Sequence, residues 1–519
     1  MNLDPAALQI LISHLTGIAE EMGAVLQRAA FSPNIKERAD CSSALFTPDG
    51  ELLVQAEHIP VHLGSMPASV AAVIDRFERD DLHPGDQFVV NDPFAGGTHL
   101  NDITVVAPCL LDGRLIGWAA NRAHHADVGG AAPGSIPADA TEIFQEGLRL
   151  PPMRLTDEVR AVLLANSRTP VERAGDLDAQ VGANVLGVAR LAEAADAPID
   201  EVVAYGERRM RAALAALPDG EWSAEDVLDS TGSHADQQVP STIRVRVALD
   251  GDGLTVDFEG TDPQSPGNVN AVEAVTASSV AFAVRCVVDP TIPANGGAMR
   301  PVHVRVPRGS IVAAESPAAV GAGNVEVSQR VADVVLAALA TAAPERVGAG
   351  NQGTMNNLLL GGRGWVYYET LGGGQGGRVD GDRPVPGQSG IHTGMTNTRN
   401  TPIEALERAF PLRVLRYRLR RGSGGAGWAP GGEGIERDLQ VLEDVTVSLI
   451  TERRVSRPKG LAGGEDGATG ENWLLPQGDE ERAERLPDKC TIRLKSGDVL
   501  RMLTPGGGGW GAPPDGEQP

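Results

Sequence analysis

The chain has 519 residues, of which 41% are hydrophobic and 22% are charged, and its formal net charge is −24. This length allows two or three globular domains. The negative charge argues against nucleic acid and an anionic membrane surface as partners, because both are bound through basic groups. Glycine (63) and proline (36) are abundant and aromatic residues make up only 4%, so we expect many turns and loops rather than a helical bundle.

The first predicted element is a helix from Asp4 to about Ala30. Asp4 suits the N-cap, Pro5 suits the first helical position, and apolar residues recur at helical spacing. These apolar residues are Leu8, Leu11, Ile12, Leu15, Ile18, Met22 and Val25. A strand over residues 38–46 and a turn at 48–50 are expected next.

Residues 103–111 and 115–120 predict two strands joined by a turn at Asp112-Gly113. Such a hairpin brings His124 and His125 back beside Asp102. A two-residue loop would pair Asp102 with Ala123 and place His125 on the face of Asp102. A three-residue loop would pair Asp102 with Arg122 and place His124 there instead. The turn sequence permits both registers, so either His124 or His125 could lie on the face of Asp102.

Together with His99, this convergence predicts a site for a divalent cation, because imidazole and carboxylate groups are its usual ligands. Each of these residues alone could equally be an ordinary structural residue. Asp40 is either a further carboxylate ligand or a residue at the entry of a strand.

Other polar residues lie near this site in the sequence. His58 and His62 have a tempting spacing, but Pro60 disfavours a helix there, and we expect structural roles for both. Glu142 and Glu146 lie in a loop rich in glycine and proline, over residues 129–152. A carboxylate near a metal site could act as a general base, although a solvated loop residue is the simpler interpretation.

Helices are expected at 171–194 and 199–217, separated by Pro198, and at 274–288 and 327–342. Alternating residues over 243–258, with a turn at 250–253, predict a second hairpin. Short strands and glycine turns follow from about residue 351. We therefore expect a mixed α/β (α+β), multi-domain fold with a β-rich C-terminal third, divided into an N-terminal region 1–225, a central region 226–350 and a C-terminal region 351–519.

Two glycine-rich segments, 372–377 and 505–510, resemble phosphate-binding loops at first sight. Neither continues into Lys-Ser/Thr or opens a helix, so turn-forming or closely packed glycine is the favoured interpretation. The four cysteines are isolated, and no apolar run approaches the roughly 20 residues of a membrane span. With no basic leader visible, we expect a cytoplasmic protein.

Several motifs follow one another along the chain. They are NDPFAGGTHLND (91–102), AHHADVGG (123–130), QEGL (145–148), DFEGT (257–261), NQGTMNN (351–357), NTPIE (400–404) and TPGGGGWG (504–511). In this order they resemble the hydantoinase B family from about residue 3 to residue 512. One departure is Arg421-Gly422, where the family commonly has Arg-Asp, which puts a binding role of that loop in doubt.

The resemblance implies a relationship to N-methylhydantoinase B subunits, the C-terminal half of 5-oxoprolinases, lactamase subunits and an acetone carboxylase subunit. In such enzymes ATP-Mg is held by a separate hydantoinase A-type subunit, which makes a phosphorylated intermediate, and the B-type subunit completes the reaction at a divalent metal. The family's metal ligands match His99, Asp102 and His124, with Asp40 as a further carboxylate. Glu146 and His125 are then the expected catalytic side chains, with His125 behind the ligands.

The leading hypothesis is the B-type component of an ATP-dependent hydrolase that opens a small cyclic amide or imide, with zinc or manganese in this chain and ATP-Mg only in the partner. A hetero-oligomer such as a dimer of heterodimers is expected. The alternatives are a component of an ATP-dependent ketone carboxylase and a non-catalytic scaffold for the A-type subunit.

Overall fold

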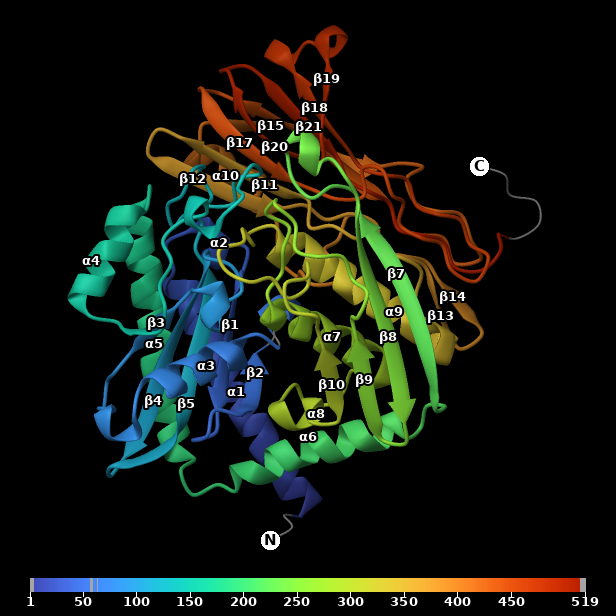
Figure 1. Ribbon diagram of the computed structural model, residues 1–519. Coiled ribbons are helices and arrows are strands. Elements are labelled where there is room, and N and C mark those ends of the chain that lie inside the picture. Colours follow the sequence, from blue (N-terminus) through green and yellow to red (C-terminus); the bar gives the residue numbers. More distant parts are fainter. Residues whose placement is uncertain (1–3, 57–58, 63, 514–519) are drawn as a thin grey trace.

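The computed structural model describes residues 4–56, 59–62 and 64–513, which form several sheets and intervening helices (Figure 1). This confirms the expected mixed α/β class, and the last third is indeed mostly β-structure. Among the described residues, no helix combines the length and apolar character needed to cross a membrane.

The N-terminal part is a six-stranded sheet with helices on both faces, in the strand order β2-β1-β5-β4-β3-β6. Its strands are β1 (Cys41–Phe46), β2 (Leu52–Ala56), β3 (Phe88–Val90), β4 (Asp102–Leu111), β5 (Arg114–His124) and β6 (Met153–Arg154). Helices α1 (Pro5–Ala29) and α5 (Pro170–Glu193) pack on one face, and α3 (Met66–Arg76) packs on the other. Most of the apolar residues that the spacing predicted are buried on one side of α1, whereas Leu11 and Val25 are only partly buried; the buried ones are Leu8, Ile12, Leu15, Ile18 and Met22. The remaining helices here are α2 (Pro33–Lys36), α4 (Asp157–Asn166) and α6 (Ile199–Leu214).

The central part is a four-stranded sheet in the order β10-β9-β8-β7, and the helices α7 and α9, whose bounds follow, pack against each other beside it. The strands are β7 (Gly220–Leu228), β8 (Ser241–Asp250), β9 (Gly253–Asp257) and β10 (Val302–Arg305), and the helices are α7 (Glu273–Val288), α8 (Gly296–Met299) and α9 (Ser328–Ala342). A π-helical turn at Gly323–Val327 leads into α9, whereas the sequence predicted a helix only from residue 327.

The C-terminal part contains two larger sheets that share one apolar core, in the orders β12-β11-β17-β20 and β15-β16-β21-β18-β19, and a small β13-β14 ribbon (Figure 1). The elements are β11 (Asn357–Gly362), β12 (Trp365–Thr370), β13 (Arg378–Asp380), β14 (Arg383–Val385), α10 (Ile403–Ala409), β15 (Leu412–Arg420), β16 (Gly434–Val441), β17 (Val445–Ile450), β18 (Glu471–Leu475), β19 (Glu484–Leu486), β20 (Lys489–Leu494) and β21 (Val499–Leu503).

Several boundaries differ from the sequence predictions. Strand β1 begins at Cys41 rather than Arg38, because Ala39 has φ of 56° and interrupts an extended backbone. Strand β7 was missed because its polar residues show no clear apolar alternation. Asp4 occupies the N-cap of α1 but forms no capping hydrogen bond with its side chain.

The glycine-rich segments pack backbone against backbone. The N–H of Gly377 donates to Gly508 O (2.9 Å), and the N–H of Gly374 donates to Pro505 O (3.0 Å). A Cβ atom on Gly374 would lie 2.1 Å from Gly432 O, so no larger residue fits there. The interpretation of these glycines as closely packed is therefore confirmed.

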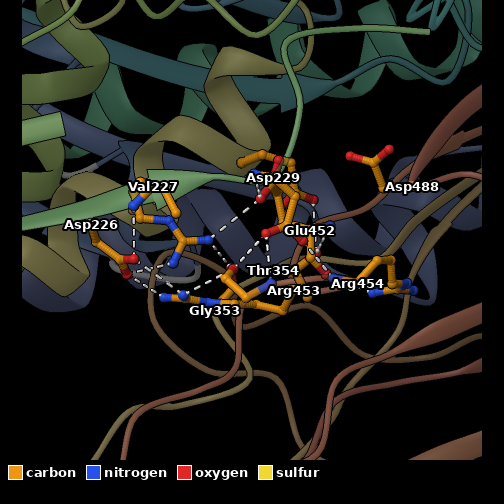
Figure 2. A network of polar contacts seen from close by, with 12 residues as sticks. Asp226, Val227, Asp229, Gly353, Thr354, Glu452, Arg453, Arg454 and Asp488 are labelled. Atoms are coloured by element: carbon orange, nitrogen blue, oxygen red, sulfur yellow. Dashed lines mark hydrogen bonds and ion pairs between the residues drawn. The ribbon is translucent and has the colours of Figure 1, made fainter. Parts of the chain in front are cut away.

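A network of charged groups joins the central part to the C-terminal part (Figure 2). Asp226 of β7 pairs with Arg453 (2.6 Å) and with Arg330 of α9 (2.7 Å). Asp229 accepts hydrogen bonds from backbone amides that include that of Arg454 (2.6 Å), and its own N–H donates to Glu452 (2.8 Å). Because these partners lie more than 100 residues apart, the network fixes distant segments against each other.

Candidate metal centre

The β4–β5 hairpin places Asp102 and His124 directly opposite each other. Asp112 and Gly113 have φ of 50° and 76°, which suits a two-residue type I′ turn. A β-bulge at Ile116 then adds one residue to β5. Both registers predicted from the sequence were therefore wrong: one extra residue moves the partner of Asp102 from Ala123 to His124.

His99, Asp102 and His124 form the group of potential metal ligands found among the described residues. His99 Nε2 lies 3.0 Å from Asp102 Oδ1, His124 Nδ1 lies 3.1 Å from the same oxygen, and the two nitrogens are 3.1 Å apart. A ring N–H points in only one direction, so hydrogen bonds cannot satisfy all three sides of this triangle. Metal–ligand bonds of about 2.1 Å require donors about 3.0–3.4 Å apart. The donor set therefore fits a divalent cation.

The hydrogen bonding of His99 also suits a ligand. Its Nδ1 lies 3.3 Å from the carbonyl oxygen of Gly321, which can accept the Nδ1 proton and leave the Nε2 lone pair facing the triangle. Histidines that bind metals commonly donate their second N–H in this way. His124 differs in that its Nε2 is buried without a hydrogen-bond partner among the described residues, but burial lowers its pKa to about 3 and keeps its ring neutral.

Asp102 is held by further groups besides the two histidines. Its Oδ2 accepts hydrogen bonds from Thr98 Oγ1 (2.7 Å) and from the side-chain amide of Asn324 (3.3 Å). His62 Nε2 lies 3.5 Å from the same oxygen. Burial opposes ionisation of Asp102, but its electrostatic interaction with His99 and its hydrogen bonds with the rings of His124, His62 and His99 hold its pKa well below the usual range. Asp102 is therefore an anion, as a ligand must be.

Asp40 and Glu146 are both buried near the triangle but outside it. The main-chain oxygen of Asp40 accepts the N–H of His124 (3.0 Å), and burial raises the pKa of the Asp40 carboxyl to about 7 against the opposing charge of Arg38. The Glu146 carboxylate accepts the N–H groups of Val320 (3.1 Å) and Gly321 (2.8 Å). Burial raises its pKa to about 7 as well.

His125 points away from the triangle. Its Nε2 lies 2.9 Å from Gln180 Oε1 of α5, on the other face of the sheet. Burial lowers its pKa to about 4, and the charge of Arg173 acts in the same direction. The structure therefore does not bring His125 together with the three potential ligands.

Sequence reasoning missed three residues around the triangle: His62, Asn324 and Tyr368. His62 was set aside because of Pro60, but residues 60–62 form a 3₁₀ turn that directs His62 to Asp102. The other histidine of that pair, His58, lies outside the described residues. Asn324 belongs to a run of buried polar residues at the start of an apolar helix, a signal that was available. Nothing in the sequence singled out Tyr368, whose ring stacks on His124.

Comparison with known proteins gives consistent results. Residues 4–513 match the family described as hydantoinase B/oxoprolinase. The chain is 36% identical to 5-oxoprolinase 1 of Arabidopsis thaliana over 98% of the chain, but it spans only 42% of that protein. It is 32% identical to the putative B-type component of a D-/L-hydantoinase from a Pseudomonas species, over 99% of the chain and 90% of the relative.

Two solved structures have a similar fold. An ATP-dependent caprolactamase from Pseudomonas jessenii matches with a TM-score of 0.91 and 28% identity, over 99% of this chain and 92% of the other. A nucleotide-free acetone carboxylase matches with a TM-score of 0.89 and 20% identity, over 99% and 76% of the two chains.

Proposed function

The chain belongs to the hydantoinase B/oxoprolinase family, and from this we propose that it is the B-type component of an ATP-dependent hydrolase that opens a cyclic amide or imide. The observation that carries this proposal is the buried group of His99, Asp102 and His124. Hydantoins, 5-oxoproline and lactams are the substrate types that the names of its relatives suggest.

The lengths of the relatives support a partner chain. This chain spans 42% of the Arabidopsis 5-oxoprolinase but 90% of the B-type hydantoinase component. Neither glycine-rich segment continues into the Lys-Ser/Thr of a phosphate-binding loop. We therefore propose that ATP-Mg binds to a separate A-type subunit, that this subunit makes the phosphorylated intermediate, and that the two chains form a hetero-oligomer.

In this proposal His99, Asp102 and His124 hold a divalent cation, either zinc or manganese. When bound, the cation supplies Lewis acidity toward an oxygen atom of the activated substrate. Asp102 contributes a negative charge to the site, and the carbonyl of Gly321 orients the ring of His99. Three protein ligands leave open the position that a substrate needs.

The other predicted site residues have supporting roles in this proposal. Asp40 is the further carboxylate beside the cation. Glu146 accepts the N–H groups of Val320 and Gly321 and thereby positions Gly321, whose carbonyl oxygen lies beside His99 Nδ1. A catalytic role of His125 stays a prediction, since its ring faces α5.

The function is tested by co-expressing the chain with an A-type subunit and measuring phosphate release with hydantoins, 5-oxoproline, lactams and ketones, each with and without bicarbonate. Release with a cyclic amide, independent of bicarbonate, would support the hydrolase. Release only with a ketone and bicarbonate would identify a carboxylase instead.

His99→Ala in the same complex tests the metal centre. We expect loss of the bound metal and of turnover with an unchanged circular dichroism spectrum, because His99 is a ligand and not part of the apolar core. Full turnover by the metal-free variant would refute the catalytic centre and favour a scaffold role.

A further inference from the structure

The ring of His124 packs against a tyrosine that lies more than 200 residues later in the chain. Tyr368 in β12 stacks on it with ring centroids 4.6 Å apart and an angle of 24° between the planes. Only 4% of Tyr368 is exposed, and the guanidinium of Arg38 lies 4.8 Å from the centre of its ring. Because the stack limits the directions in which the imidazole can turn, Tyr368 controls where Nδ1 of His124 points.

The hydroxyl group of Tyr368 is anchored in turn. It donates to Asn357 Oδ1 (2.9 Å), and the side-chain amide of Asn357 donates to Glu326 Oε1 (2.8 Å). Thr354 Oγ1 donates to the same carboxylate oxygen (3.1 Å) and accepts the N–H of Glu452 (3.1 Å), a member of the charged network of Figure 2. All these groups are buried, so the tyrosine is held by a continuous chain of hydrogen bonds.

Glu326 belongs to the π-helical turn Gly323–Val327, which also reaches the other side of the triangle. Asn324, two residues earlier, donates to Asp102 Oδ2 (3.3 Å). The turn packs at Gly323 against the backbone of Asn270, where a Cβ atom would lie 1.9 Å from Asn270 O. One turn therefore contacts Asp102 directly and His124 through Asn357 and Tyr368. Single π-helical turns inside helices are frequent at functional sites.

We infer that Tyr368 is a positioning residue for His124, held through Asn357 by Glu326, and that the same π-helical turn positions Asp102 through Asn324. Asp102 and His124 come from one hairpin of the N-terminal region and His99 comes from the turn just before it, but the orientation of these ligands depends on the central and C-terminal regions. This inference rests on the metal centre of the proposed function. Groups that orient metal ligands commonly change metal affinity 10- to 100-fold when they are replaced.

The neighbouring Tyr367 provides a matched control. It is also buried in β12, but its side chain points to the opposite face and packs against Phe410 with ring centroids 5.0 Å apart. It makes no contact with the triangle among the contacts that the described residues show.

The experiment is a titration of the metal-free full chain with Co²⁺, followed by visible absorption, which reports the coordination geometry. Tyr368→Leu removes the ring and the hydroxyl, and we expect Co²⁺ to bind about 10- to 100-fold more weakly, with a changed spectrum. Tyr368→Phe keeps the ring but loses its anchor, so we expect a smaller loss of affinity. Tyr367→Phe should bind Co²⁺ like the parent.

Parent affinity and parent spectrum in both Tyr368 variants would overturn the inference. If Tyr368→Leu fails to fold, the Tyr368→Phe variant still tests the positioning role of Tyr368, because it retains the packing of the ring. A parent chain that binds no Co²⁺ would instead refute the metal centre of the proposed function, and the inference with it. The parent titration therefore separates the two failures.

Discussion

Replacing Lys489 by methionine removes a buried ammonium group from the network that joins the central and C-terminal parts. Lys489 is fully buried in β20, and its Nζ lies 2.5 Å from Glu452 Oε1 and 2.9 Å from Asp488 Oδ2. Methionine has a similar length and shape, so the Lys489→Met variant keeps the packing of the side chain and loses its charge.

The expected cost follows from these two contacts. A hydrogen bond to a charged group contributes about 1.5–3 kcal/mol. Removing one partner of a buried ion pair costs about 3–5 kcal/mol, because the remaining charge has no compensation. We therefore expect Lys489→Met to lower the free energy of unfolding by about 3–5 kcal/mol at pH 8.

The effect should depend on pH through Glu452. Burial raises its pKa from 4.5 to about 7, although Lys489 acts in the opposite direction. Because this pKa lies above the unfolded value, the stability that the group contributes is full below pH 4.5 and is lost as the pH rises through 7. Without Lys489 the pKa rises further, so Glu452 is protonated at pH 6 and the variant loses less stability there than at pH 8.

Urea unfolding of the full chain, followed by near-ultraviolet circular dichroism at pH 6 and pH 8, measures both effects. Lys495→Met is the matched control: Lys495 also pairs with a carboxylate, Asp444 (2.8 Å), but it is 72% exposed, and its removal should leave the curve unchanged. Neutralising Glu452 and Asp488 in the Lys489→Met background should recover most of the stability. A Lys489→Met curve equal to that of the control would refute the reasoning.

Three further predictions concern other parts of the molecule. Gly374→Ala should destabilise the chain strongly in thermal unfolding, since its Cβ would lie 2.1 Å from Gly432 O, whereas Gly17→Ala, with open space around it, should stabilise α1 by up to about 1 kcal/mol. Burial raises the pKa of Glu326 to about 8, so the parent loses stability as the pH rises from 5 to 8, whereas Glu326→Gln has no proton to lose there and should become more stable relative to the parent. A difference in thermal midpoint between variant and parent that is the same at pH 5 and pH 8 would contradict this. Saturating Zn²⁺ or Mn²⁺ at 100 times its Kd should stabilise the chelator-treated parent by about 2.7 kcal/mol and leave Asp102→Asn unaffected, as seen in thermal shift measurements.

The part of the candidate metal centre that comes from neighbouring residues of the chain was predictable from the sequence. The spacing of apolar residues and the Asp112-Gly113 turn were enough to bring His124, at the end of β5, beside Asp102 and His99. The register was not predictable, because the bulge at Ile116 follows from how β5 packs in the sheet and has no signature in the local sequence.

The surroundings of the site could not be predicted because they are far away in the chain. Asn324 and Tyr368 lie more than 200 residues after Asp102, and no periodic pattern indicates contacts of that kind. The most regular elements, such as α1 and the β8–β9 hairpin, were predicted almost to the residue. Local periodicity therefore predicts elements, whereas the relative placement of distant segments depends on packing.

The glycine segments 372–377, 424–434 and 505–511 restrict how this protein can vary over evolutionary time. Where backbone lies directly on backbone, hydrogen is the only side chain that fits, and any change in the first two bases of a glycine codon introduces a larger residue or a stop. Natural variants should therefore be rarest in this part of the chain, even though it contains none of the potential metal ligands. Strict invariance of these glycines would then result from the packing of the backbone and not from a role in catalysis.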